Sequence, residues 1–179
     1  MTTATQTARG PKATNPNTEV SGTPQSTDNF VRNPQIAFWK PFQGKGCAIF
    51  FEYNASKKCV FFEMRPETQG GTDDDPKFDK DRRVLSKLGF ADLGEMLAVI
   101  KGRKEGAGLN KDGKGWSMFH KNANGNTAIT FERTENGIRV GMSAKVGDAA
   151  ANRQSANITV GEATLLEIFL TNAVTGMCG

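Results

Sequence analysis

Two stretches of the chain carry the same pattern of apolar and polar positions, in which a short alternating segment leads into an apolar-faced helix. They cover residues 85–101 (LSKLGFADLGEMLAVIK) and residues 156–174 (ANITVGEATLLEIFLTNAV). Alternation is typical of strands, and apolar residues three or four apart are typical of one buried helix face. Each stretch also closes a run of short alternating segments. The pattern therefore predicts one unit of strands followed by a helix, used twice.

In the first half, alternation predicts strands near residues 36–42, 47–53, 58–65 and 82–88. A four-residue loop at 54–57 would put Phe51 opposite Val60 on the core face and Phe50 directly opposite Phe61 on the outer face. A helix follows, with Asp92 in its first turn and Gly102 at its end. Its expected buried stripe consists of Phe90, Leu93, Met96, Leu97 and Ile100.

In the second half, strands are expected near residues 115–122, 126–133, 138–145 and 152–158. A tight turn at 134–137 would pair Phe131 with Val140 on the core face and Glu132 with Arg139 on the outer face. The capping box at 159–162 starts a helix that is expected to run to about residue 175. The residues it is expected to bury are Leu165, Leu166, Phe169, Leu170 and Ala173.

The connections are short enough for antiparallel pairing, so the predicted class is α+β, with two antiparallel four-stranded units each followed by a helix. Residues 1–34 are rich in Thr, Asn, Gln and Pro and have hardly any large apolar side chain. Such a segment cannot bury enough surface to offset its conformational entropy, so a disordered tail is expected there. Residues 35–179 are expected to form a single α+β domain.

Composition narrows the classes of function. The net charge of +4 and the pI of about 9.0 are compatible with a polyanionic partner. No apolar run approaches the roughly 18 residues of a membrane span, and the N-terminus lacks the apolar region of a secretory signal. The three cysteines lack CxxC spacing, which favours reduced thiols. A cytoplasmic location is therefore expected.

The sequence carries no catalytic signature. His120 is the only histidine, and its predicted face is shared with Trp116 and Met118, which favours a core or interface role. The acidic run at 73–75 lacks EF-hand spacing, and the glycine-rich stretch at 102–115 matches neither a phosphate-binding loop nor a dinucleotide motif. We therefore expect no enzyme, no metal and no cofactor.

Nucleic-acid binding has positive support from cations and aromatics. The glycine-rich loop at 101–115 carries five cations: Lys101, Arg103, Lys104, Lys111 and Lys114. Such a loop would let the cations follow the flexible backbone of a nucleic-acid strand. Alternatively, it is only a solvated surface loop. Phe50 and Phe61 on the outer face, with Trp39 nearby, would stack unpaired bases. The residues expected to contact phosphates beside them are Lys40, Lys45, Lys57, Lys58 and Arg65. Alternatively, a helix or a neighbouring subunit covers this aromatic face.

The architecture over residues 36–175 resembles the Whirly-like single-stranded DNA-binding superfamily, which is related in fold to the transcriptional positive cofactor four and to kinetoplastid guide-RNA-binding proteins. The segment at 53–67 (YNASKKCVFFEMRPE) is similar to the Whirly hairpin, and Lys57 and Lys58 fall where the family has its basic turn. The segment at 87–102 (KLGFADLGEMLAVIKG) is similar to small phage-encoded proteins of this fold, which act in phage replication or transcription in the bacterial host cytoplasm. The loops at 66–80 and 101–115 depart from the family pattern.

The resemblance implies a homo-oligomer, a dimer or commonly a tetramer, with single-stranded DNA laid across sheet edges. The candidate residues and the family resemblance together favour a sequence-tolerant single-stranded DNA-binding protein that acts in DNA replication or transcription and has no catalytic activity. One alternative is an RNA-binding or annealing factor. The other is a structural or adaptor protein whose aromatic face is an oligomer seam, for instance a partner of a polymerase.

Overall fold

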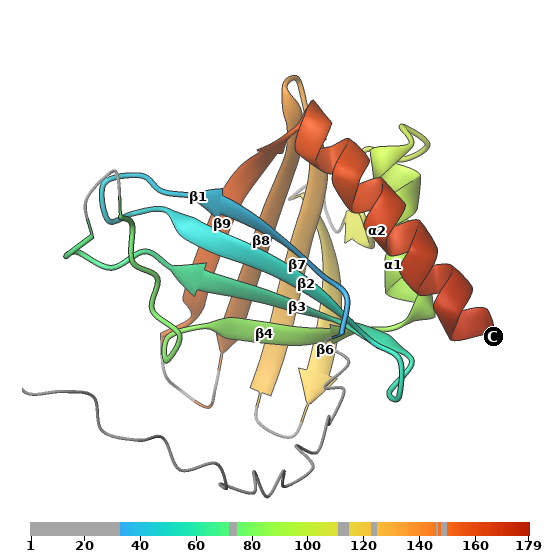
Figure 1. Cartoon of the computed structure of the whole chain (residues 1–179), viewed down its shortest axis with the longest axis horizontal. Coiled ribbons are helices and arrows are strands. Elements are labelled where there is room, and N and C mark those ends of the chain that lie inside the picture. Colours follow the sequence, from blue (N-terminus) through green and yellow to red (C-terminus); the bar gives the residue numbers. More distant parts are fainter. Residues whose placement is uncertain (1–32, 72–74, 111–114, 123–124, 146, 148–149) are drawn as a thin grey trace, which may run out of the picture. The chain divides into compact units, whose positions relative to one another are not determined.

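Two antiparallel sheets, each followed by a helix, make up the computed structural model of the chain (Figure 1). The structure describes residues 33–71, 75–110, 115–122, 125–145, 147 and 150–179, and all of them belong to one unit that spans residues 32–179. The tail predicted at 1–34 lies almost entirely outside the described residues. So do Lys111, Lys114 and most of the acidic run at 73–75.

The first sheet has the order β1-β2-β3-β4, with β1 (Gln35–Lys40), β2 (Cys47–Asn54), β3 (Cys59–Pro66) and β4 (Val84–Leu88). The helix α1 (Phe90–Ile100) follows it. The second sheet has the order β5-β6-β7-β8-β9, with β5 (Leu109–Asn110), β6 (Trp116–Asn122), β7 (Gly125–Thr134), β8 (Gly137–Lys145) and β9 (Asn152–Thr159). The helix α2 (Val160–Cys178) ends the chain. The repeated plan is confirmed, and the short strand β5 adds to the four strands expected in the second unit.

The apolar residues that alternate along the strands form the core. Phe51 and Phe62 are fully buried and their rings stack with centroids 4.6 Å apart and planes at 2°. In the second sheet, Phe131 pairs with Val140 and both are fully buried, as predicted. Burial of each such side chain contributes about 1.5–3 kcal/mol, so these inward faces supply much of the stability of the fold.

The register of β2 on β3 differs from the prediction by two residues. Phe50 pairs with Glu63, and Phe61 pairs with Glu52, so the two phenylalanines are not directly opposite each other. The cause is the turn. Asn54 still belongs to β2 and its side-chain oxygen accepts a hydrogen bond from the Lys57 backbone N–H at 2.9 Å, which moves the loop to residues 55–58. Because side chains alternate with a period of two, a shift of two keeps every residue on its predicted face.

The helix starts are as predicted. Asp92 accepts a hydrogen bond from the Gly89 backbone N–H at 2.8 Å, and Thr159 forms a capping box with Glu162. Two residues predicted to be buried are exposed: Phe90 is 55% exposed because it is the first residue of α1, and Leu165 is 56% exposed on the outer side of α2. The prediction is confirmed for Leu93 and Met96 in α1 and for Leu166, Leu170 and Ala173 in α2, and the structure adds Val99, Ala163 and Met177 to the buried stripes.

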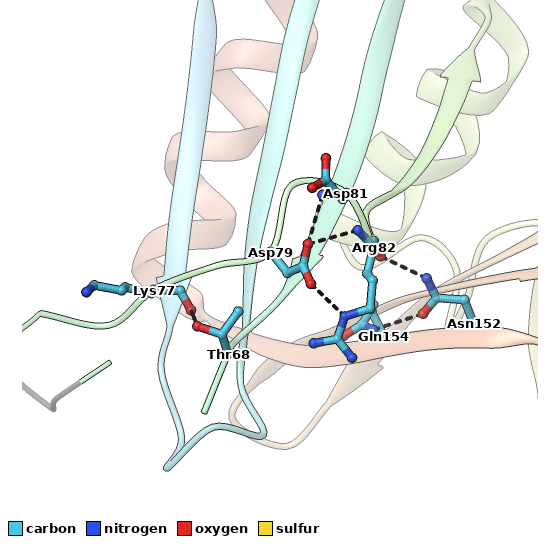
Figure 2. Close-up of polar contacts among 7 residues, drawn as sticks. All are labelled: Thr68, Lys77, Asp79, Asp81, Arg82, Asn152 and Gln154. Atoms are coloured by element: carbon cyan, nitrogen blue, oxygen red, sulfur yellow. Dashed lines mark hydrogen bonds and ion pairs between the residues drawn. The ribbon is translucent and has the colours of Figure 1, made fainter. Parts of the chain in front are cut away.

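The segment between β3 and β4 was predicted as a loop, but its described part is fixed at both ends. Glu67 forms an isolated β-bridge with Phe78. Figure 2 shows how Asp79 then holds Arg82, accepting bonds from its backbone N–H at 3.0 Å and its Nε at 2.6 Å. The Arg82 carbonyl in turn accepts a bond from Asn152 of β9 at 2.8 Å (Figure 2). This chain of bonds ties the first sheet to the second.

Among the described residues there is neither a helix long and apolar enough to cross a membrane nor a group of three or more side chains that could hold a metal ion.

Candidate nucleic-acid interface

Three aromatic rings gather on the outer face of the first sheet, and we call Trp39, Phe50 and Phe78 the aromatic cluster. Trp39 meets Phe50 edge to face with centroids 5.2 Å apart, and it meets Phe78 at 5.3 Å. The Arg65 guanidinium lies 4.2 Å from the centroid of Phe50. Phe50 is therefore only 6% exposed, whereas Trp39 is 55% exposed. Trp39 is the ring that the aromatic cluster exposes to solvent, and the buried Phe50 packs against it.

Phe61 lies on the same face of the sheet, because it alternates with Phe62. It is half-buried, and the Lys57 ammonium lies 5.3 Å from its ring centroid. Lys58 in the turn and Lys87, which pairs with Phe61 across β3 and β4, are both exposed. A ring flanked by free cations is suited to a base with its phosphate. Phe61 thus forms a second aromatic position, separate from the aromatic cluster.

The cations predicted beside these rings have different surroundings. Lys45 is exposed in the turn between β1 and β2. Arg65 forms an ion pair with Glu63 in addition to its contact with Phe50. Lys40 lies on the opposite face from Trp39, because neighbouring strand residues alternate, and its ammonium bonds both carboxylate oxygens of Glu162 at 2.5 and 2.6 Å. The structure therefore does not bring Lys40 together with the aromatic residues.

The ion pair of Lys40 connects the first strand to the last helix. Burial alone would raise the pKa of the Glu162 carboxyl, but hydrogen bonds from Lys40 and Thr159 outweigh burial and hold that pKa below its usual range. Glu162 is therefore ionised near neutral pH and keeps Lys40 engaged.

The described part of the basic glycine-rich segment, residues 101–110 and 115, is not the adaptable loop that was expected. Ala107 donates its backbone N–H to Phe131 at 2.9 Å, and Arg133 donates to Glu105 at 2.8 Å, so residues 105–107 run beside β7. Glu95 of α1 accepts bonds from Lys104 and from the Gly108 backbone N–H.

The cations predicted in this segment have different surroundings. Lys104 is bound to Glu95 and lies 5.4 Å from the ring centroid of Trp116. Lys101 lies 3.5 Å from Glu167 of α2. Arg103 is exposed. Lys111 and Lys114 lie outside the described residues. Of the three cations that the structure describes, Lys101 and Lys104 pair with carboxylates of the helices and not with the aromatic cluster.

A groove of about 460 Å³ on the outer face of the second sheet was not predicted from the sequence. Small side chains leave this space open where Gly141 of β8 pairs with Ser155 of β9. Trp116, Arg139 and Arg153 also line it. Alternation along β8 and β9 could have revealed the two arginines on one face. The groove is polar and carries both charges, because Glu132 also lines it and lies 4.0 Å from Arg139.

The surroundings of Cys47 and His120 indicate structural roles for both side chains. Burial raises the pKa of the Cys47 thiol to about 11, although the charge of Lys40 opposes this, so the thiol is neutral. His120 lies 3.2 Å from Asp92, the residue that caps α1. Its contact fits the structural role predicted for it.

Known proteins of similar structure are found although no protein-family model and no curated protein matches the chain. MRP1/MRP2 of Trypanosoma brucei has a TM-score of 0.59 at 18% identity, over 82% of this chain and 95% of that one. A guide-RNA-binding protein complex bound to a guide RNA has a TM-score of 0.57 at 14% identity, over 85% and 97%. The plant transcriptional regulator PBF-2 has a TM-score of 0.60 at 13% identity, over 82% and 83%.

At these identities the likeness concerns the fold, which is the Whirly-like α+β fold that the sequence predicted. The resemblance to phage-encoded proteins finds no support among these structures.

Proposed function

We propose that this chain is a sequence-tolerant single-stranded DNA-binding protein that acts in replication or transcription and has no catalytic activity. The observation that carries the proposal is the exposed Trp39, which is braced by Phe50 and Phe78 and has cations nearby. An exposed indole held in place by its neighbours offers a base a stacking surface without first losing side-chain entropy.

Binding would combine stacking with phosphate contacts. Trp39 and Phe61 take unpaired bases, and Lys45, Lys57 and Lys58 take phosphates. Arg103, and Arg139 and Arg153 in the groove of the second sheet, offer further exposed cations for phosphates. Duplex DNA is excluded because paired bases hide their faces from a stacking ring.

The neighbours of similar fold support a nucleic-acid ligand. One is described as bound to a guide RNA, and another as a transcriptional regulator. The first favours RNA as the alternative ligand, and the second favours transcription as the process. Because the 2′-hydroxyl distinguishes RNA from DNA, direct competition between the two decides the ligand.

Fluorescence anisotropy of labelled oligo(dT) tests the proposal at low and moderate salt, with duplex DNA and oligo(U) as competitors. We expect binding whose affinity falls as salt rises, since phosphate contacts release counterions. Duplex DNA is expected not to displace the labelled oligo(dT). If oligo(U) displaces it more strongly than unlabelled oligo(dT) does, RNA is the ligand. If the protein binds neither oligomer at low salt, the proposal fails and the adaptor alternative takes its place.

We also propose that the chain forms a homo-oligomer through α2. Its exposed surface carries Val160, Leu165 and Ile168, each more than half exposed, and an exposed apolar surface of this kind suits contact with a second copy of the chain. Replacing Leu165 and Ile168 by lysine is expected to lower the mass measured by light scattering to that of one chain. The matched control replaces Leu85 of β4 and Leu109 of β5, two exposed leucines outside α2, by lysine and should leave the mass unchanged. A mass that neither pair alters would place the interface elsewhere.

A further inference from the structure

The turn between β1 and β2 has an unusual conformation. Gln43 and Gly44 both have positive φ angles, 48° and 75°, and Lys45 donates its backbone N–H to Phe42 at 2.8 Å. Two successive left-handed residues make the kind of tight turn that suits a twisted hairpin. Glutamine adopts this conformation at a cost that glycine avoids, so other contacts must hold the turn.

Glu67 provides those contacts from the end of β3. Its carboxylate accepts hydrogen bonds from the Phe42 backbone N–H at 2.7 Å and the Gly46 backbone N–H at 2.9 Å. Its own N–H donates to the Gly46 carbonyl at 2.8 Å. The Glu67 residue is only 7% exposed. Charge-assisted bonds to two N–H groups, largely shielded from water, fix both ends of the turn.

The ionisation of Glu67 agrees with this role. The hydrogen bond from Phe42 lowers the pKa of the Glu67 carboxyl; burial opposes this shift, and bonds from Gly46 and Gly44 add to it. The net result is a pKa below the usual range, so Glu67 is an anion near neutral pH.

The same residue also fixes part of the aromatic cluster. The backbone of Glu67 forms the bridge to Phe78, and Phe78 contacts Trp39. The side chain of Glu67 therefore holds the turn, and its backbone holds a ring of the aromatic cluster. The turn and the aromatic cluster are thus fixed to one another through a single residue.

This fixed turn presents an exposed aromatic ring. Phe42 is 66% exposed, which is more than Trp39. Lys45, three residues further on, and Lys77, next to Phe78, are exposed as well. Free cations beside an exposed ring are complementary to a ligand that has both negative charge and flat apolar faces. A single strand of nucleic acid has both.

We propose that Phe42 is a further base-stacking residue beside the aromatic cluster, and that Glu67 is the positioning residue that holds Phe42 for this contact. The proposal rests on the proposed function and adds one nucleotide to its binding site. Glu67 does not touch the ligand itself and acts through the turn.

The first test compares Phe42→Ala with Phe90→Ala, which removes an exposed phenylalanine at the start of α1. With oligo(dT) we expect Phe42→Ala to weaken binding by about 5- to 20-fold, near the lower end of the loss for one stacked base. Phe42→Trp should retain the affinity, and Phe90→Ala should bind like the wild type. If wild type binds and Phe42→Ala equals Phe90→Ala, the stacking role of Phe42 is wrong while the proposed function stands. If wild type binds neither oligo(dT) nor oligo(U), the proposed function itself has failed.

The second test asks whether Glu67 acts through Phe42, by combining Glu67→Ala with Phe42→Ala. If it does, Glu67→Ala weakens binding by a similar factor alone and by a clearly smaller factor when Phe42 is already alanine, the remainder being the contribution of Lys45 in the same turn. Glu67→Gln should recover part of the affinity, because an amide oxygen also accepts hydrogen bonds. It also serves as the folded variant if Glu67→Ala does not fold. Additive losses, or loss in Glu67→Gln independent of Phe42, would overturn the positioning role.

Discussion

Replacing Trp39 by alanine is expected to weaken the binding of oligo(dT) by about 10- to 100-fold, the factor that corresponds to one stacked base at the middle of its measured range. Trp39 is the exposed ring of the aromatic cluster, and Phe50 and Phe78 hold it from two sides. Because the ring is already fixed, its loss removes stacking energy directly. Anisotropy titrations of wild type and variant at the same salt measure this factor.

Two further variants show whether the effect belongs to the ring. Trp39→Tyr keeps an aromatic surface and should recover most of the affinity. Phe90→Ala removes a ring that is equally exposed, 55% in both cases, but lies at the start of α1. It should bind like the wild type. If Trp39→Ala keeps full affinity but dissociates an oligomer, the aromatic face is an assembly seam and the stacking assignment is wrong.

The faces of the strands were predictable because they depend only on alternation. Phe51 and Phe62 lie on the core face and Phe50 and Phe61 on the outer face, as the sequence indicated. Their exact partners were not predictable in the same way, because the register depends on which residues form the turn. The side-chain bond of Asn54 to Lys57 keeps Asn54 in β2, and alternation carries no information about that bond.

The candidate site was predictable where it lies on strands and unpredictable where it depends on distant contacts. Alternation should have separated Lys40 from Trp39, because neighbours on a strand face opposite ways. Phe78 lies in an irregular segment without periodicity, and only its pairing with Glu67 brings it to Trp39. Likewise, the bond between Lys104 and Glu95 that fixes the basic segment joins a loop to a helix face.

Phe61 and Phe62 are neighbours in β3 but lie on opposite faces, so replacing each one tests stability and nucleic-acid binding separately. Phe62 is fully buried against Phe51, with ring centroids 4.6 Å apart, so Phe62→Ala leaves a cavity in the core. We expect it to lower the free energy of unfolding by about 3–5 kcal/mol, seen as a lower denaturation midpoint in urea. Phe61→Ala is the matched control, since it deletes the same ring one position away on the outer face.

Phe61 is half-buried and contacts Lys57, so its removal should cost about 1 kcal/mol of stability or less, while oligo(dT) binding weakens several-fold. The two variants therefore affect different quantities: Phe62→Ala mainly lowers the free energy of unfolding, and Phe61→Ala mainly lowers the affinity for oligo(dT). Folded Phe62→Ala, measured well below its denaturation midpoint, should bind nearly as the wild type does, because its side chain points away from the outer face. If Phe61→Ala proved the more destabilising, the assignment of the two faces of β3 would be reversed, and the outer surface proposed for nucleic acid would be part of the core.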